Sequence, residues 1–547
     1  MEPHLANIYE SIADAVGDRP ALVHGELTRT WSELDRRSAQ IAAGLSSAGL
    51  GVQSKVAFFL YNGPQYVEAQ LAAMKARFVP VNINYRYRDA ELAYLLDNSD
   101  AEALFFHSSL AATVDQVRER MTRMKVFVQV PDDDTPLLDG AVDYESFAAA
   151  YEPMPRIHRS GDDIFLLYTG GTTGLPKGVM FALSSWAETF PVAALMLAGR
   201  DPETPLDKLA SVVASMEPEE RLATLPAVPL MHGTGLTYGA LLPQTLGAAV
   251  VTLTNRSLDG HELLRAVEAN RVTTMSIVGD VLSKPIIRAI DEGADGRAYD
   301  LSSLRNIYSS GTMWSSEVKQ ALLQRMPHIA LTDIMNASEG AMATQVTTGE
   351  GGAATARFIP NPTTKVFTDD NREVVPGSGE VGLLAAGGRV PVGYYKDPVK
   401  TAETFREIDG ERYSFPGDMA TIEADGTITL LGRGSQVINT GGEKVFREEV
   451  EEAVKRVPGV RDCLVVGVAD ESFGQAVSAV VAVEDGAVVS REDIVGFVKK
   501  ELAGYKAPRH VVFVGDVPRA PNGKADHKTA KVVAEAELAG QRGRICG

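Results

Sequence analysis

The 547-residue chain lacks the features that mark secreted, metal-clustered or membrane-spanning proteins. Its two cysteines, Cys463 and Cys546, are too few for a disulfide framework, which favours a reducing compartment. The first twenty residues have neither a basic start nor an apolar stretch, so they do not resemble a secretory signal. The sequence contains no run of about 18 apolar residues, so we predict no transmembrane helix. We therefore expect a cytoplasmic protein, and a peripheral contact with a membrane stays open.

The chain also has fewer basic than acidic residues. The chain has 53 Lys and Arg residues against 72 Asp and Glu residues, which gives a formal charge of −19. General nucleic-acid binding requires a basic surface to neutralise phosphates, so we expect no nucleic-acid partner. Hydrophobic residues make up 45% of the chain and charged residues 23%, which is typical of a globular protein and argues against disorder.

Strand-like and helix-like segments alternate along the first half of the chain. Apolar runs predict strands at 56–60, 78–81, 103–106, 249–253 and 273–278. Helical periodicity follows a capping box that begins at Thr30, and it recurs at 64–76, 90–98 and 261–269. This order predicts the α/β class, with layered and mostly parallel sheets covered by helices.

The last ~110 residues have a different pattern. Strands are predicted at 462–468, 476–483 and 510–514, and a helix is predicted to begin after Ser490. We therefore expect a large N-terminal domain at 1–432 and a small, mobile α+β domain at 436–547. The glycines around 433–435 would provide a hinge between them.

The most informative segment is the loop after the apolar residues 164–167. Residues 167–180 read LYTGGTTGLPKGVM, in which glycines and threonines precede Lys177. Glycines allow backbone N–H groups to approach an anion closely, and a lysine adds a point charge suited to phosphate. The kinase and GTPase type of phosphate loop is excluded, because Pro176 and Gly178 flank the lysine. A dinucleotide fingerprint at 233–239 is also excluded, because Tyr238 stands at its third glycine.

The segment YTGGTTGLPKGV resembles the phosphate loop of the adenylate-forming superfamily, which comprises acyl- and aryl-CoA synthetases, adenylation domains of peptide synthetases and beetle luciferases. Further motifs follow in the family's order over nearly the whole chain. The resemblance implies two half-reactions. A carboxylate first attacks the α-phosphorus of ATP and releases pyrophosphate, and a thiol then displaces AMP. It also implies that the enzyme uses ATP, Mg²⁺ and coenzyme A with a small-molecule acid.

The resemblance also assigns roles to residues that match the family's motifs. The catalytic residues it implies are Lys524, Thr172, His232 and Glu339, and Glu339 would also hold the metal. The implied ATP- and AMP-binding residues are Thr169, Gly170, Gly171, Thr172, Thr173, Gly174, Lys177, Ser310, Gly311, Thr312, Met335, Asn336, Ala337, Ser338, Asp418, Arg433 and Lys524. The acyl and CoA path would include His232, Gly233, Gly235, Gly441 and Gly442, and the hinge would be at Gly434 and Ser435.

Three positions depart from the family's pattern. Met335 stands where relatives have an adenine-stacking tyrosine, and Pro416 replaces a threonine before Gly417 and Asp418. Ser435 stands at the hinge in place of an aspartate or lysine. A thioether can cover a purine face, so the adenine site is retained in this interpretation.

The segments GYYKDPVKTAETF and GRGSQVINTGGEKVF resemble a branch of fatty-acyl-CoA synthetases common in actinobacteria. That resemblance implies an acid–thiol ligase for a medium- or long-chain fatty acid or a steroid side-chain acid, and we expect a homodimer. Two alternatives stay open. The chain could load a separate carrier protein instead of CoA, or it could be a nucleotide-binding relative without enzymatic activity.

Overall fold

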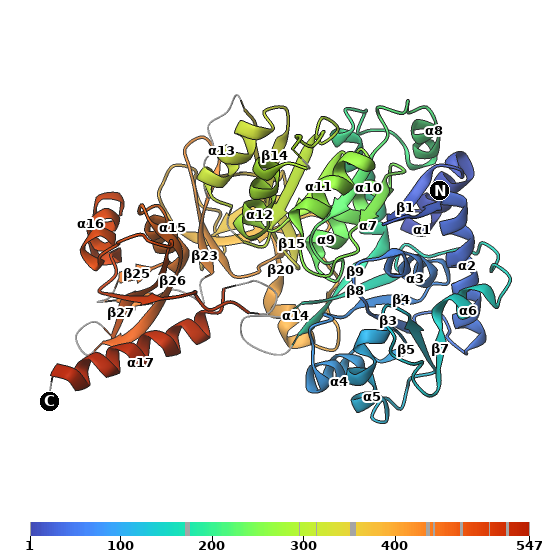
Figure 1. Ribbon diagram of the computed structural model, residues 1–547, viewed down its shortest axis with the longest axis horizontal. Coiled ribbons are helices and arrows are strands. Elements are labelled where there is room, and N and C mark those ends of the chain that lie inside the picture. Colours follow the sequence, from blue (N-terminus) through green and yellow to red (C-terminus); the bar gives the residue numbers. More distant parts are fainter. Residues whose placement is uncertain are drawn as a thin grey trace. The chain divides into compact units, whose positions relative to one another are not determined.

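The computed structural model describes residues 2–545, apart from 170–175, 295, 313, 350–356, 434–437, 441–442, 471–473, 503 and 521–524. The chain divides into two compact units (Figure 1). The large unit comprises Met1–Thr355 and Ala386–Ser414, and the small unit comprises Ala356–Ala385 and Phe415–Gly547. The predicted hinge at 433–435 stays a prediction, because residues 434 and 435 lie outside the described part of the chain.

The first sheet of the large unit carries the glycine-rich loop. Its strand order is β19 (Gly393–Tyr394), β9 (Lys177–Ala182), β8 (Ile164–Thr169), β4 (Val79–Asn82), β3 (Lys55–Phe59), β5 (Ala101–His107), β6 (Val126–Val130) and β7 (Ala141–Asp143). All neighbouring pairs from β8 to β7 are parallel, whereas β9 is antiparallel to both β8 and β19.

The second set of strands in the large unit is also mostly parallel. Its order is β2 (Leu27–Thr30), β1 (Pro20–His24), β11 (Ala249–Thr252), β10 (Ala223–Pro226), β12 (Thr274–Ile277), β13 (Asn306–Ser310), β14 (Ala330–Ala337) and β15 (Gly340–Thr347). Only β2 and β15, at its two ends, are antiparallel to their neighbours. An antiparallel hairpin consists of β20 (Phe405–Ile408) and β21 (Glu411–Ser414).

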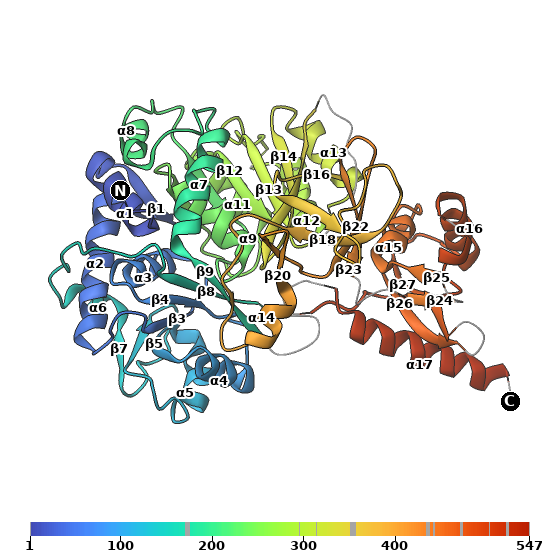
Figure 2. The same ribbon diagram turned by 180° about the vertical axis from the view of Figure 1, so that it is seen from behind.

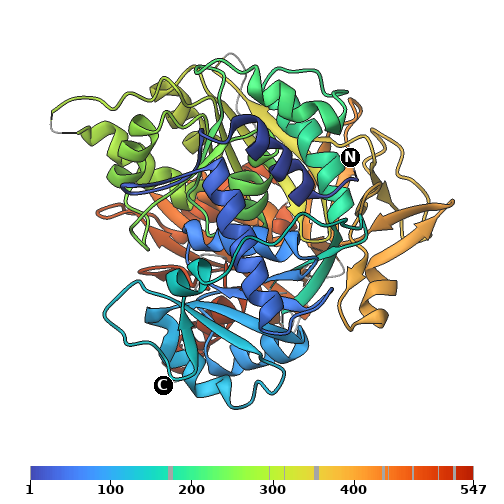
Figure 3. The same cartoon turned by 90° about the vertical axis from the view of Figure 1, so that its right-hand side faces the viewer.

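Helices cover the faces of these sheets. They are α1 (Leu5–Val16), α2 (Trp31–Ser47), α3 (Pro64–Lys75), α4 (Asp89–Asn98), α5 (Ala111–Arg118), α6 (Tyr144–Ala149), α7 (Leu183–Leu197), α8 (Leu209–Ala214), α11 (Gly260–Ala269), α12 (Gly279–Glu292), α13 (Ser316–Arg325) and α14 (Pro398–Thr404). The predicted capping box forms at the start of α2, where Glu33 N–H donates to Thr30 Oγ1 and Thr30 N–H donates to Glu33 Oε2. Figure 3 shows α1 beside α7, with which it shares packing contacts.

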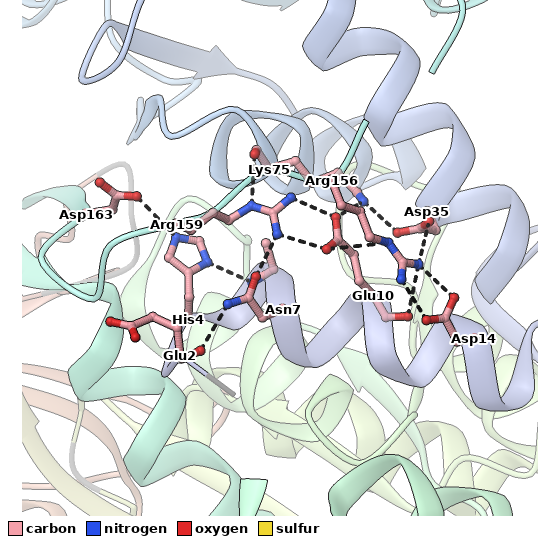
Figure 4. A network of polar contacts seen from close by, with 11 residues as sticks. Glu2, His4, Asn7, Glu10, Asp14, Asp35, Lys75, Arg156, Arg159 and Asp163 are labelled. Atoms are coloured by element: carbon pink, nitrogen blue, oxygen red, sulfur yellow. Dashed lines mark hydrogen bonds and ion pairs between the residues drawn. The ribbon is translucent and has the colours of Figure 1, made fainter. Parts of the chain in front are cut away.

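A buried ionic network holds α1 against α2, α3 and the segment that leads into β8 (Figure 4). Lys75 Nζ donates to Glu10 and to Asp35 at 2.6 Å, and Arg159 donates to both oxygens of Glu10. Asp163, which directly precedes β8, accepts from Arg77. Charges buried in this way are costly unless they are paired, so the network fixes where β8 begins.

The start of α1 is capped by His4. Ala6 N–H donates to His4 Nδ1 at 3.1 Å, and Nε2 lies 3.7 Å from Asp163 Oδ2. An acceptor at Nδ1 requires the neutral ring with its proton on Nε2. Burial lowers the pKa of His4 to about 4, which agrees with this neutral form.

The small unit begins with antiparallel strands in the order β16 (Arg357–Pro360), β23 (Ile428–Arg433), β22 (Asp418–Ile422) and β18 (Gly382–Ala386), and β17 (Thr364–Phe367) pairs with β18. Its second sheet has the order β25 (Glu443–Val445), β24 (Ile438–Thr440), β27 (Gly474–Val483) and β26 (Val460–Asp470), and β28 (His510–Val514) pairs with β27.

Helices cover both faces of this second sheet. Alternate residues of β26 and β27 pack on α15 (Arg447–Lys455) and α16 (Arg491–Glu501) on one face, and on α17 (His527–Ile545) on the other (Figure 1). The predicted α/β class, with a large sheet-rich part and a small α+β part, is confirmed.

Candidate active site

The glycine-rich loop connects the antiparallel strands β8 and β9. Thr169 and Lys177 are register partners at the last pair of this hairpin. The predicted phosphate-binding residues Gly170, Gly171, Thr172, Thr173 and Gly174 lie between them and outside the described residues. The apolar residues 164–167 form a strand that extends to Thr169. The structure therefore fixes both ends of the loop.

The β8 end of the loop is held beside the His232 segment by Asn82, which is buried at the end of β4. Asn82 Nδ2 donates to Tyr168 O at 3.1 Å and to Met231 O at 2.6 Å, and its Oδ1 accepts from Tyr168 N–H at 2.7 Å. One amide side chain thus connects the end of β8 to the residue before His232.

A second asparagine, Asn62, holds the same segment from the loop that follows β3. Its Nδ2 donates to Pro226 O and Val228 O, and its Oδ1 accepts from Leu230 N–H at 2.7 Å. Sequence reasoning missed both asparagines, because their partners are backbone groups that lie 86 to 168 residues away in the chain. The signal that could have found them is a polar residue at the end of a buried strand, as Asn82 is in β4, or shortly after one, as Asn62 is after β3.

His232 precedes a short helix, α9 (Gly233–Leu236), which continues as a π-helix η3 (Thr237–Leu241) and α10 (Leu242–Gln244). A Cβ on Gly235 would lie 2.5 Å from Pro229 O, so this turn requires glycine. Gly233 is under no such restriction, because its Cβ would meet only Leu167 at 3.4 Å. The predicted acyl-path residues therefore lie together at the start of one helix, although only Gly235 is needed for backbone packing.

The β9 end of the loop meets Glu339 through Tyr394. Lys177 Nζ lies 5.6 Å from the centre of the Tyr394 ring, and the Tyr394 hydroxyl donates to Glu339 Oε1. Lys177 Nζ also donates to Asp397 Oδ2 at 2.7 Å. The hydrogen bond from Lys177 holds the pKa of the Asp397 carboxyl below its usual range. The sequence did not single out Tyr394 or Asp397, which belong to β19 and to the start of α14.

The predicted small-residue segment lies at the carboxyl end of β13. Ser310 Oγ donates to Asn336 Oδ1 on the neighbouring strand β14. Gly311 has a φ of +88°, in the left-handed region that favours glycine. Thr312 Oγ1 is buried and has no hydrogen-bond partner among the described residues.

Asn336 and its neighbours end β14 and begin the turn into β15. Met335 is 7% exposed, whereas Asn336, Ala337, Ser338 and Glu339 are half-buried. The structure therefore brings Ser310 and Asn336 together, and it brings Lys177 and Glu339 to the same tyrosine, Tyr394.

In the small unit, Asp418 and Arg433 are directly opposite each other in the antiparallel pair of β22 and β23. Gly417, which precedes Asp418, has a φ of +99°. The two residues assigned to the ribose, about fifteen positions apart in the sequence, are thus neighbours in the fold. Gly434, Ser435, Gly441, Gly442 and Lys524, the other residues assigned to this unit, lie outside the described residues.

The described residues include no group of three or more His, Cys, Asp and Glu side chains that could hold a metal ion by themselves. In the described part of the chain no helix is long and apolar enough to cross a membrane.

Comparisons with known proteins agree with this geometry. Residues 9–395 match the family model for AMP-binding enzymes, and residues 449–524 match the model for the C-terminal domain of AMP-binding enzymes. The chain is 38% identical over 543 residues to the medium-chain acyl-CoA ligase Mig of Mycobacterium avium, with 96% of this chain and 97% of that protein covered. It is also 38% identical over 540 residues to a 3-oxocholest-4-en-26-oate–CoA ligase of Rhodococcus rhodochrous, with 97% and 96% covered.

Solved structures support the fold. The anthranilate CoA ligase AuaEII in complex with anthranoyl-AMP matches with a TM-score of 0.81 and 19% identity, over 98% of each chain. ATP-bound MatB from Rhodopseudomonas palustris matches with a TM-score of 0.78 and 21% identity, over 96% of this chain and 98% of that chain. Because the family models cover most of the chain and the ligases are similar over almost their whole length, the predicted family is confirmed: the chain belongs to the AMP-binding enzymes.

Proposed function

We propose that the chain is an ATP-dependent acid–thiol ligase that converts a carboxylic acid and coenzyme A into acyl-CoA through acyl-AMP. The observation that carries this proposal is the convergence of site segments on the glycine-rich loop within the large unit. Asn82 joins the β8 end of the loop to the His232 segment, and Tyr394 is near Lys177 at the β9 end and hydrogen-bonded to Glu339. The two similar CoA ligases support coenzyme A as the thiol.

In the first half-reaction, a carboxylate oxygen of the acid attacks the α-phosphorus of ATP, and the bond to the β-phosphate breaks to release pyrophosphate. Both reactants are anionic, so the protein must position them and neutralise charge. Lys177 and the backbone of the loop would bind the phosphates, and Lys524 would lie between the α-phosphate and the acyl carboxylate. Asp418 and Arg433 would hold the ribose.

Mg²⁺ would be held by Glu339 together with phosphate oxygens, where it supplies positive charge to the departing pyrophosphate. This donor set fits the ion, because Mg²⁺ is usually bound by one or two carboxylates and substrate phosphates. The hydrogen bond from Tyr394 orients the carboxylate of Glu339. Ser310, Gly311, Thr312 and Met335 would contact the adenine.

In the second half-reaction, the thiolate of coenzyme A attacks the acyl carbon, and the bond between that carbon and the AMP oxygen breaks. His232 would lie beside the acyl carbonyl, and Gly441 and Gly442 would line the thiol path. Since Lys524 and the Gly441–Gly442 turn serve different steps, we propose that the small domain rotates about Gly434 and Ser435 between them.

We propose a medium- or long-chain fatty acid or a steroid side-chain acid as the substrate. The names of the similar ligases support both classes. A homodimer and a cytoplasmic location belong to the same proposal.

The proposal is tested with the purified protein, ATP, Mg²⁺ and a panel of free acids. We expect pyrophosphate release that depends on the added acid, followed by AMP and an acyl-CoA of the expected mass when coenzyme A is supplied. Nucleotide binding without acid-dependent pyrophosphate would identify a non-enzymatic relative. Acyl-AMP that transfers to a phosphopantetheine carrier protein but not to coenzyme A would identify a carrier-loading ligase.

A further inference from the structure

The first turn of α15 contacts the last strand before the proposed hinge. Glu448 of α15 lies against Gly432 of β23, and a Cβ on Gly432 would overlap with the carboxyl group of Glu448. Gly432 also has a φ of +106°, so its conformation and this close approach both require glycine. Figure 2 shows α15 beside β23, with which it shares packing contacts. The contact therefore joins the strand that ends at Arg433 to the first helix after the hinge.

The apolar side of α15 packs on the other side of the hinge. Val450, Ala453 and Val454 lie in a hydrophobic core with residues of β26 and β27, and the described members of that core include none from β22 or β23. Strands β22 and β23 precede the hinge in the chain, whereas α15, β26 and β27 follow it. A rotation about Gly434 and Ser435 would therefore carry α15 along with the second sheet and separate Glu448 from β23.

The carboxyl group of Glu448 has little access to water in this contact. Its Oε2 atom is buried and has no hydrogen-bond partner among the described residues. Burial disfavours an ionised carboxylate more than a neutral acid, and it raises the pKa of Glu448 to about 7. The first turn of a helix favours an anion, so burial outweighs the helix dipole at this position.

Charged groups around Glu448 act on its pKa in both directions. The carboxylate of Glu451, one turn further along α15, raises it, whereas His527 at the start of α17 and the neighbouring Arg447 lower it. Glu451 Oε1 accepts from His527 Nε2 at 2.7 Å and from Val465 N–H at 2.8 Å, so this second carboxylate is compensated. Arg447 Nε is itself buried without a hydrogen-bond partner among the described residues, so Arg447 does not compensate Glu448 through that atom.

We propose that Glu448 is a proton-dependent latch on the domain rotation: its neutral carboxyl group holds α15 against Gly432, and its ionised form favours the orientation in which this contact is broken. When the contact opens, the O–H bond of the acid breaks, the proton passes to water and the carboxylate becomes hydrated. Glu448 is thus a positioning residue that acts through the hinge. This inference rests on the proposed function and assigns a regulatory residue to its rotation.

The direction of the pH dependence follows from the two environments of the carboxyl group. Its pKa is about 7 in the contact and returns to the ordinary value of 4.5 in water, so opening releases a proton between these pH values. The equilibrium constant for opening should therefore rise roughly twentyfold from pH 5.5 to pH 7.5 and then level off, because both forms are ionised at higher pH.

The orientation is measured in the full-length protein with one fluorophore on each side of the hinge. Ala424→Cys labels the exposed turn between β22 and β23, and Val488→Cys labels a residue that is 98% exposed between β27 and α16. Cys546→Ser removes one native thiol, and the other, Cys463, is buried. We expect the energy transfer in the labelled parent to change between pH 5.5 and pH 7.5. In Glu448→Gln it should stay at the parent's pH 5.5 value throughout, because the amide is neutral at every pH.

The same dependence should affect catalysis. The two half-reactions are measured separately, as acid-dependent pyrophosphate release and as thioester formation from supplied acyl-AMP. Dividing the parent's ratio of the two rates by that of Glu448→Gln at each pH removes the pH dependence of the chemical steps. This quotient should change by up to roughly twentyfold from pH 5.5 to pH 7.5.

The matched control is Glu449→Gln, which neutralises the next carboxylate of the same helical turn. Glu449 is paired with Lys506 at 2.6 Å, so this variant should keep the parent's pH dependence of energy transfer. Energy transfer that does not change with pH in the parent would overturn the proposal. An equal change in Glu448→Gln would also overturn it and would identify His527 as the titrating group. The fluorescence measurement needs no substrate, whereas the proposed function is tested by acid-dependent pyrophosphate release, so the two failures are distinguishable.

Discussion

Replacing Asn82 with alanine tests whether the glycine-rich loop is positioned from β4. The substitution removes three hydrogen bonds and leaves Tyr168 N–H, Tyr168 O and Met231 O without their buried partner. At about 1 kcal/mol for each group, the free energy of unfolding should fall by roughly 3 kcal/mol. Since both the β8 end of the loop and the His232 segment lose their common anchor, we also expect adenylation to suffer.

The expected loss is about 10²-fold in kcat/KM for acid-dependent pyrophosphate release, the scale for a displacement of about 1 Å at a reacting centre. The assay is pyrophosphate release at varied ATP concentration, run beside thermal unfolding of the same sample. The half-reaction from supplied acyl-AMP and coenzyme A should fall less, because it does not require the triphosphate to be positioned.

Gln129→Ala provides the matched control. Gln129 is also a buried amide with three hydrogen bonds, to Ser108 Oγ, Pro136 O and Leu138 N–H. It lies on β6, four strands from β8 and therefore about 19 Å away at roughly 4.8 Å per strand. Both variants should lose similar stability, and only Asn82→Ala should lose adenylation. Equal activity losses, or parental adenylation in Asn82→Ala, would refute the reasoning.

Four further outcomes are expected. Glu339→Gln should raise the Mg²⁺ concentration needed for half-maximal pyrophosphate release, because an amide is a weaker ligand for a hard cation; an unchanged titration would remove the residue from the site. Lys524→Ala should slow adenylation ~10²–10³-fold and spare thioester formation from supplied acyl-AMP, and equal losses in both assays would contradict its role. Gly235→Ala should lose roughly 1–3 kcal/mol in thermal unfolding, because its Cβ would lie 2.5 Å from a backbone carbonyl, whereas Gly233→Ala should be tolerated. Burial lowers the pKa of His4 from 6.5 to about 4. Between these pH values the unfolded chain binds a proton that the folded chain does not, so the free energy of unfolding of the parent should fall by up to about 3 kcal/mol as the pH falls from 6.5 to 4. In denaturant titrations, His4→Asn, which keeps a capping side chain, should lack this part of the pH dependence.

The fold was predictable where local sequence determines local structure. The Thr30–Glu33 and Ser490–Asp493 capping boxes form at the starts of α2 and α16, because each motif satisfies backbone donors within four residues. The apolar run predicted at 510–514 is β28. The arrangement of the strands in sheets was not predictable, because it depends on packing between segments such as β1 and β11 that are more than 200 residues apart.

From the sequence, we could predict only those site residues that lie in family motifs. Ser310 and Asn336 were found because each belongs to a segment with a family pattern, and the structure brings them into contact. Asn82 lies in none of the quoted motifs, Tyr394 lies in a segment that was used only for the branch of the family, and each acts on a partner far away in the sequence. A single sequence gives no signal for such contacts beyond a polar residue at the end of a buried strand.

Strand β12 is a different case, because its departure from the usual pattern is visible in the sequence. Thr274-Met275-Ser276-Ile277 alternates polar and apolar residues, as a strand with one face in water would, yet it is buried and parallel to both neighbours. Such a strand is expected to be apolar on both faces.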